Sequence, residues 1–224
     1  MKNFRKFHHY NDLLLAHVFF AVVCIPTGGK IVDIAGIPLS ISIFYFPFIY
    51  VVSDVLTEVY GYAAARRVVW YGVCAQVLAM AIFTVVAYYP PASSFSQNAA
   101  FQTVLSAAPQ FVLFGTIAVF LGDISNNYVL AKMKVWMNGR ATGLRFLTST
   151  VVGQFVNTAF FYTFGLWGFL STSFLLQSIA MASLAKIAVE VVMLPFTIRF
   201  SNWLKKKESI DVFDTQTDFN PLKF

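Results

Sequence analysis

Two carboxylates stand one helical turn apart in a stretch that is otherwise mostly apolar, YVVSDVLTEVYGYAAARR (residues 50–67). The i, i+3, i+4 spacing of Asp54, Thr57 and Glu58 would place all three on one face of a helix. Ionisable groups inside an apolar span are costly, so they usually face a cavity and act there. A carboxylate in such a place accepts hydrogen bonds from a ligand or carries a proton. We therefore expect Asp54 and Glu58 to border a ligand pocket.

Polar side chains of similar kinds interrupt three later apolar runs. They are Asp123 in 109–130, then Gln154 and Asn157 in 146–168, and Lys186 and Glu190 in 174–200. Thr150 shares a helical face with Gln154 and Asn157. If successive spans alternate in direction, all these groups come to a similar depth, which favours one shared, partly hydrated pocket. Asp123 is also a candidate carrier of a coupling proton, because an acid held away from water binds a proton more readily.

Structural alternatives exist for some of these residues. Glu58 could lie in the interface and pair with Arg66 or Arg67. Lys186 and Glu190 could form an intrahelical pair, although Lys before Glu is the poorer order for one. Asp54 and Asp123 have no basic residue three or four positions away, which favours a functional role. His17, in the first apolar run, is interpreted as a buried structural histidine.

The elements that position these residues must lie in a membrane. Apolar residues make up 58% of the 224 residues and charged residues 12%, and 25 residues are phenylalanine. The mean hydropathy is +0.68. An ordinary globular chain has roughly 45–50% apolar and about 25% charged residues. The net charge of +6 sits in short clusters between apolar runs, which indicates membrane loops and gives no support to nucleic-acid binding.

The apolar runs predict an all-α, polytopic membrane protein with six transmembrane helices. A helix needs about 20 mainly apolar residues to cross the bilayer, and six runs qualify: 11–27, 41–61, 68–88, 109–130, 146–168 and 174–200. Basic residues cluster at the N-terminus, in alternate loops and after the sixth run, so both termini should be cytoplasmic. We expect one transmembrane domain over 1–203 and a loosely attached, polar cytoplasmic tail over 204–224.

The sequence gives no support to an enzyme. It has no Walker A loop, dinucleotide fingerprint or HExxH motif. An intramembrane aspartyl protease needs two aspartates, which Asp54 and Asp123 could supply, but only Gly122–Asp123 of its GxGD motif is present. No metal site and no cofactor are indicated. What remains is a carrier for a small molecule in a lipid bilayer.

Several separated motifs follow one another along the chain. The first is FPFIYVVSDVLTEVYGYAAARR (46–67), with F-P, D-x-x-x-E-x-Y-G and A-R-R positions. The others, in order, are LGDISNNYVLAKMK, RFLTSTVVGQFVNTAFF, ASLAKIAVEVVMLPFTIR and FDTQTDFNPLKF. Together they resemble the queuosine precursor transporter family of small bacterial inner-membrane proteins, formerly described as vitamin uptake transporters. The resemblance covers most of the chain from about residue 12 onward. It departs at Asn157, where family members often have an aspartate.

The resemblance implies import of 7-deazaguanine bases such as preQ0, preQ1 or queuine across the inner membrane by a secondary carrier. The binding residues would be Asp54, Glu58, Asp123, Gln154, Asn157, Lys186 and Glu190. An alternative from the same size and span number is a substrate-binding membrane subunit that needs a separate energy-coupling complex. Six-span bundles often dimerise, so a homodimer is compatible with the sequence, which indicates no interface.

Overall fold

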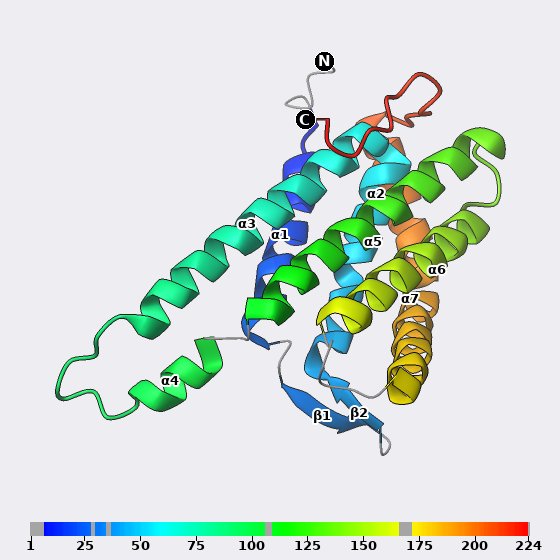
Figure 1. Cartoon of the computed structure of the whole chain (residues 1–224). Helices are drawn as coiled ribbons and strands as arrows, with labels where there is room; N and C mark the ends of the chain where they lie inside the picture. The colour runs from blue at the N-terminus through cyan, green and yellow to red at the C-terminus, as the bar shows by residue number, and fades with distance from the viewer. Residues whose placement is uncertain (1–6, 28–29, 35–36, 106–108, 166–171, 224) are drawn as a thin grey trace.

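The protein folds as a bundle of helices, seen in a computed structural model that describes residues 7–27, 30–34, 37–105, 109–165 and 172–223 (Figure 1). In these ranges the helices are α1 (Tyr10–Thr27), α2 (Phe46–Tyr60), α3 (Tyr62–Tyr88), α4 (Asn98–Leu105), α5 (Pro109–Trp136), α6 (Thr142–Phe160) and α7 (Thr172–Glu208). Two short strands, β1 (Ile31–Ile34) and β2 (Ile37–Ser40), pair antiparallel between α1 and α2. The all-α prediction is confirmed apart from this hairpin, which stands in a loop of the predicted scheme.

Helix α2 lies at the centre of the bundle, in contact with α1, α3, α5 and α7 (Figure 1). All of its fifteen residues except Phe48 are buried. Pro47 in its first turn suits a helix start, because a backbone N–H there has no intrahelical partner anyway. Since protein covers every side of α2, it can carry polar residues that a helix facing lipid could not.

Gly61 alone separates α2 from α3 and has a positive φ of 87°. A Cβ there would lie 2.7 Å from Val212 Cγ1 and 3.0 Å from Asp214 Oδ1. Glycine is therefore required at this reversal, both for the backbone angle and for the space.

The number of membrane crossings stays a prediction. By length and composition, three described helical stretches could cross a bilayer: Tyr62–Tyr88, Val112–Trp136 and Ser178–Glu208. Helix α2 has only 15 residues, because Ile41–Phe44 form a 3₁₀ turn where the sequence predicted the start of a span. Helix α6 ends at Phe160 and continues as a π-helical turn over Phe161–Gly165; the rest of the predicted fifth span, 166–168, lies outside the described residues.

One end of the bundle gathers the starts of α1, α3 and α6 and the ends of α5 and α7 (Figure 1). These helix ends carry the basic residues Arg66, Arg67, Lys132, Lys134, Arg145 and Lys205–Lys207. Hairpin β1–β2 and α4 lie at the opposite end. The side of the membrane that the basic end faces stays a prediction.

The expectation of a loosely attached tail is wrong. Asp214 Oδ2 accepts a hydrogen bond of 3.0 Å from the backbone N–H of Tyr62, which opens α3 and has no partner within its own helix. The Arg66 guanidinium donates to the carbonyls of Asp218 and Asn220 at 2.8 and 2.6 Å. The tail therefore supplies a side-chain carboxylate and two backbone carbonyls as acceptors for the first turns of α3. Helix α7 also continues to Glu208, past the boundary placed at residue 203.

Helices α5 and α6 cross at two glycines. A Cβ on Gly122 would meet Tyr50 Oη and would lie 2.7 Å from Asn157 Cβ and 2.8 Å from the carbonyl oxygen of Gly153. A Cβ on Gly153 would meet Asn126 Cβ at 2.7 Å and Gly122 O at 2.9 Å. Small residues allow the backbones of membrane helices to approach closely. The crossing thereby brings the polar residues of α5 and α6 next to α2.

Replacing Gly122 by alanine is expected to destabilise the protein by about 1–3 kcal/mol, because the added methyl group overpacks the crossing. The matched control is Gly115→Ala on the same helix, where the new Cβ would lie 3.6 Å from Phe161, an ordinary contact. Thermal unfolding in detergent measures both variants. Equal melting temperatures for the two variants would contradict this account of the crossing.

Candidate functional site

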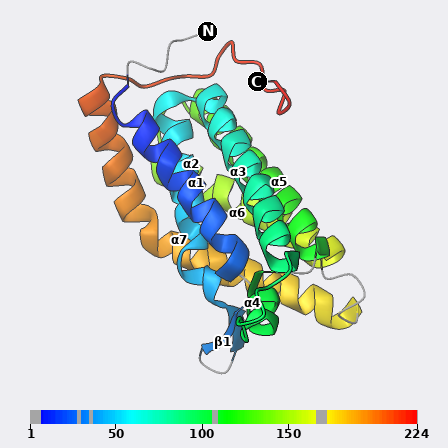
Figure 2. The same ribbon diagram turned by 90° about the vertical axis from the view of Figure 1, so that its left-hand side faces the viewer.

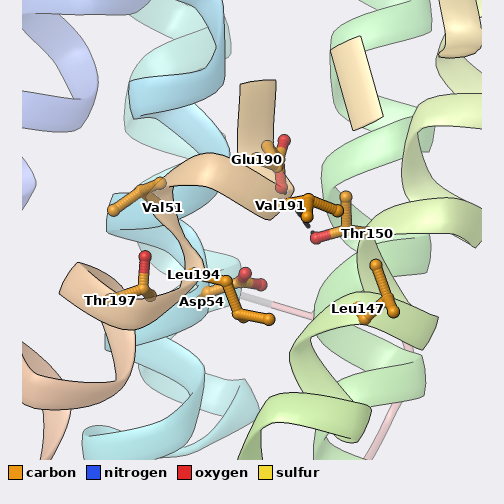
Figure 3. Close-up of a pocket in the computed structure, with 8 residues that line it drawn as sticks. All are labelled: Val51, Asp54, Leu147, Thr150, Glu190, Val191, Leu194 and Thr197. Carbon is orange, nitrogen blue, oxygen red and sulfur yellow. Dashed lines mark hydrogen bonds between the residues drawn. The ribbon is translucent and has the colours of Figure 1, made fainter. Parts of the chain in front are cut away.

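A small pocket opens between α2, α6 and α7, beside the middle of α2 (Figure 3). Its lining residues are Val51 and Asp54 of α2, Leu147 and Thr150 of α6, and Glu190, Val191, Leu194 and Thr197 of α7. Its free space is small, about 10 Å³, which is enough for about one water molecule. Two carboxylates, Asp54 and Glu190, therefore reach one pocket from helices that are far apart in the sequence.

Helix α7 bends beside this pocket (Figure 2). It contains Pro195, which has no backbone N–H to donate to the carbonyl of Val191. A proline inside a helix is a common cause of a sharp bend. The lining residues Glu190, Val191 and Leu194 all lie within the five residues before the proline. The pocket therefore adjoins the point at which α7 lacks a backbone hydrogen bond.

Glu190 is held by α6. Its Oε2 accepts a hydrogen bond of 2.7 Å from the Thr150 hydroxyl, and its Oε1 accepts one of 2.7 Å from the Gln154 amide. Glu190 is 6% exposed, so these bonds replace the water that the carboxylate loses. Gln154 Oε1 is buried and without a hydrogen-bond partner among the described residues. The Gln154 amide oxygen can therefore accept a hydrogen bond from a ligand.

Lys186 stands one turn before Glu190 and also bonds to α6. Its ammonium donates to Asn157 Oδ1 at 2.9 Å and lies 4.4 Å from the centre of the Phe46 ring. The interpretation of Lys186 and Glu190 as an intrahelical pair is thus replaced by two separate links to α6. The Lys186 ammonium is thus held between an amide oxygen and an aromatic face.

Asp54 receives its hydrogen bond from α5. Asn126 Nδ2 donates to Asp54 Oδ1 at 2.7 Å, and the neighbouring Asn127 Oδ1 accepts from Ser53 and Thr57 at 3.0 and 2.9 Å. The sequence placed Thr57 on the same face as Asp54, and this network confirms that placement. The sequence alone did not indicate Asn126 as the partner of Asp54, because the two residues lie 72 positions apart.

Thr197 was missed as a lining residue. It stands seven positions after Glu190, which is two turns along the same helical face. A hydroxyl at that spacing is the only signal that the sequence offers for it.

Asp123 does not line this pocket. It is fully buried between α5 and α1, where His17 Nε2 lies 3.5 Å from its Oδ2. Both of its oxygens lack a hydrogen-bond partner among the described residues. The sequence predicted a single shared pocket, whereas the structure separates Asp123 from the group around Asp54 and Glu190.

Glu58 does not line the pocket either and belongs to an ion cluster at the basic end of the bundle. Its carboxylate pairs with both Nη atoms of Arg145, with Lys205 Nζ at 2.5 Å and, more distantly, with Lys134 Nζ at 4.0 Å. The predicted alternative partners, Arg66 and Arg67, were therefore the wrong ones. The true partners lie 87 and 147 positions away and could not be recognised from spacing.

Asp211 of the tail completes this ion cluster. It pairs with Lys134 and with Lys205, the latter at 3.0 Å. Burial alone would raise the pKa of Asp211, but the hydrogen bonds and charges of the two lysines outweigh it and hold the pKa below its usual value. The tail is thus fixed to α5 and α7 by a carboxylate that stays ionised.

Apolar helices around a pocket lined by two carboxylates and two threonines suit a membrane transporter. Comparison with known proteins agrees with that class. The family model described as "Putative vitamin uptake transporter" matches residues 40–200, and the chain belongs to this family. The resemblance predicted from its motifs is confirmed, and a transporter family agrees with the prediction that the chain is not an enzyme.

One curated relative is named "Probable queuosine precursor transporter" and comes from Bacillus subtilis (strain 168). It is 27% identical over 185 residues, which cover 82% of this chain and 81% of the relative. No solved structure matches the chain.

Replacing Glu58 by glutamine is expected to destabilise the protein by about 3–5 kcal/mol, because it leaves Arg145 buried without its carboxylate. The double variant Glu58→Gln/Arg145→Leu should cost less than the sum of the two single variants, since residues in one network are not additive. Unfolding in graded SDS measures all three. Normal stability together with weakened ligand binding in Glu58→Gln would contradict this role and favour a binding role.

Proposed function

We propose that the protein imports 7-deazaguanine bases, the precursors of queuosine, across the bacterial inner membrane, with the basic end of the bundle in the cytoplasm. Family membership and the name of the Bacillus relative support the substrate class. The observation that carries the proposal is the convergence of Asp54 and Glu190 on one pocket beside Gln154, Asn157 and Lys186.

The chemistry of the base suits these groups. A deazaguanine offers ring N–H and exocyclic NH₂ donors along one edge and a carbonyl acceptor beside them. The carboxylates of Asp54 and Glu190 accept hydrogen bonds from such donors, and the Lys186 ammonium or an amide NH₂ donates to the carbonyl. The Phe46 ring is 8% exposed and lies under the Lys186 ammonium, so it would stack on a flat base only after that ammonium moved aside.

The pocket must widen to accept a ligand. Its free space of about 10 Å³ holds about one water molecule, whereas sites that enclose a small molecule usually measure roughly 300–1,000 Å³. The hydrogen bonds of Glu190 and Lys186 to α6 hold the two helices together. A base that supplies its own donors and acceptor replaces those bonds, and α7 has a bend beside Pro195 at which it can move.

Replacing Asp54 by asparagine or Glu190 by glutamine is expected to weaken substrate binding roughly 10- to 100-fold. The reason is that a hydrogen bond to a charged group contributes about 1.5–3 kcal/mol. Uptake of a labelled precursor into cells that lack their own synthesis measures transport, and binding to the purified protein measures affinity. The matched control is Asp12→Asn, an acid-to-amide change at an exposed position of α1.

Full uptake by both pocket variants would overturn the assignment of the pocket. Binding of unrelated vitamins, but not of deazaguanines or guanine, would overturn the substrate class. Purified protein that transports in liposomes without another subunit would exclude the alternative of a binding subunit that depends on an energy-coupling complex.

A further inference from the structure

Asp123 is a fully buried carboxylate without a strong hydrogen-bond donor: the Ser53 hydroxyl of α2 is within reach of it but donates to Asn127 Oδ1. Asp123 is 0% exposed, and both of its oxygens lack a partner among the described residues. His17 of α1, 1% exposed, places Nε2 at 3.5 Å from Asp123 Oδ2. The pair therefore joins α1 to α5 in a place that water does not reach.

A buried carboxylate anion without donors is very costly, and binding a proton removes that cost. A metal ion would need more ligands than this pair supplies, and the described residues contain no group of three His, Cys, Asp or Glu that could hold one. We propose that Asp123 and His17 form a proton-binding site that couples the import of the base to a proton gradient. This inference rests on the proposed function.

The charged and titratable groups around Asp123 come from two further helices. Tyr50 and Asp54 of α2 and Glu190 of α7 are close enough to interact with it electrostatically. From α3, the residue packed against the His17 ring is Gly72, which brings no charge. Among the described residues, the groups that face Asp123 from α2 and α7 are thus the Ser53 and Tyr50 hydroxyls and two acids, none of which is a cation that would hold Asp123 ionised.

Two contacts connect this site to the pocket. Asn126 stands one turn after Asp123 on α5 and donates to Asp54, which lines the pocket. Gly122, the residue before Asp123, packs under the Tyr50 hydroxyl of α2. A change of charge on Asp123 therefore acts on a helix turn that contacts the substrate network directly.

The test uses the purified full chain in liposomes with a labelled deazaguanine. Exchange of labelled for unlabelled base, with no gradient, measures transport. Accumulation is then measured with a proton gradient of one pH unit, acid on the outside, and separately with a sodium gradient. Because one pH unit corresponds to a factor of 10, the proton gradient should support accumulation up to about tenfold.

Asp123→Asn imitates the protonated acid and cannot release a proton. It is expected to retain exchange and to lose accumulation, so that the base only equilibrates. His17→Gln is expected to shift the midpoint of the pH dependence of exchange, which a merely structural role would not do. The His17→Gln variant also tests the coupling site if Asp123→Asn fails to fold. Asp12→Asn, at an exposed position of α1, is the control and should behave as wild type.

Exchange by the wild type without accumulation in a proton gradient would overturn the coupling site and leave the proposed function standing. Accumulation driven by sodium instead, normal accumulation by folded Asp123→Asn, or loss of its exchange would also overturn the coupling site. Absence of any exchange by the wild type would overturn the proposed function itself.

Discussion

The burial of α2 is the constraint on which the rest of the structure depends. A helix surrounded on all sides by other helices cannot satisfy polar side chains with water, so each of them needs a partner from a neighbour. Asn126 donates to Asp54, and Asn127 accepts from Ser53 and Thr57. Arg145 pairs with Glu58. These bonds fix how α5 and α6 lie against α2. The close approach of α5 and α6 at Gly122 and Gly153 is what allows both to reach it.

The sequence predicted the elements better than the contacts. Apolar runs and turn residues located α1, α3, α5 and α7. However, α3 begins at Tyr62 and not at 68, and α5 and α7 end at Trp136 and Glu208 and not at 130 and 200, because these helices continue past their apolar stretches. Helix α2 was drawn too long, since the apolar residues of Ile41–Phe44 continue its pattern although they form a 3₁₀ turn. The hairpin before it gave no clear signal, because its strands have only four residues each.

The site was predicted in its composition and only partly in its grouping. Asp54 and Glu190 line one pocket, and the helical spacing of Thr150, Gln154 and Asn157 identified the face that α7 contacts. A predicted depth says nothing about position around the circumference of a bundle, however. Asp123 does not line the pocket, and its pairing with His17 of α1 depends on how the helices are arranged.

The two acids that stand one turn apart on α2 illustrate the same limit and its mechanical consequence. Glu58 ties the last turns of α7 to α2 through Lys205, and the backbone N–H of His9 is bonded to Glu208 at the same end. Asp54, four residues earlier, lines the pocket beside the part of α7 that precedes Pro195, where Glu190 is hydrogen-bonded to α6. The last turns of α7 are thus joined to α2 by an ion pair that is costly to break from one side. The middle of α7 is joined to α6 by hydrogen bonds that a ligand can replace. The same i, i+4 spacing therefore separates an anchor from a binding group, because one turn of α2 crosses from the ion cluster to the pocket.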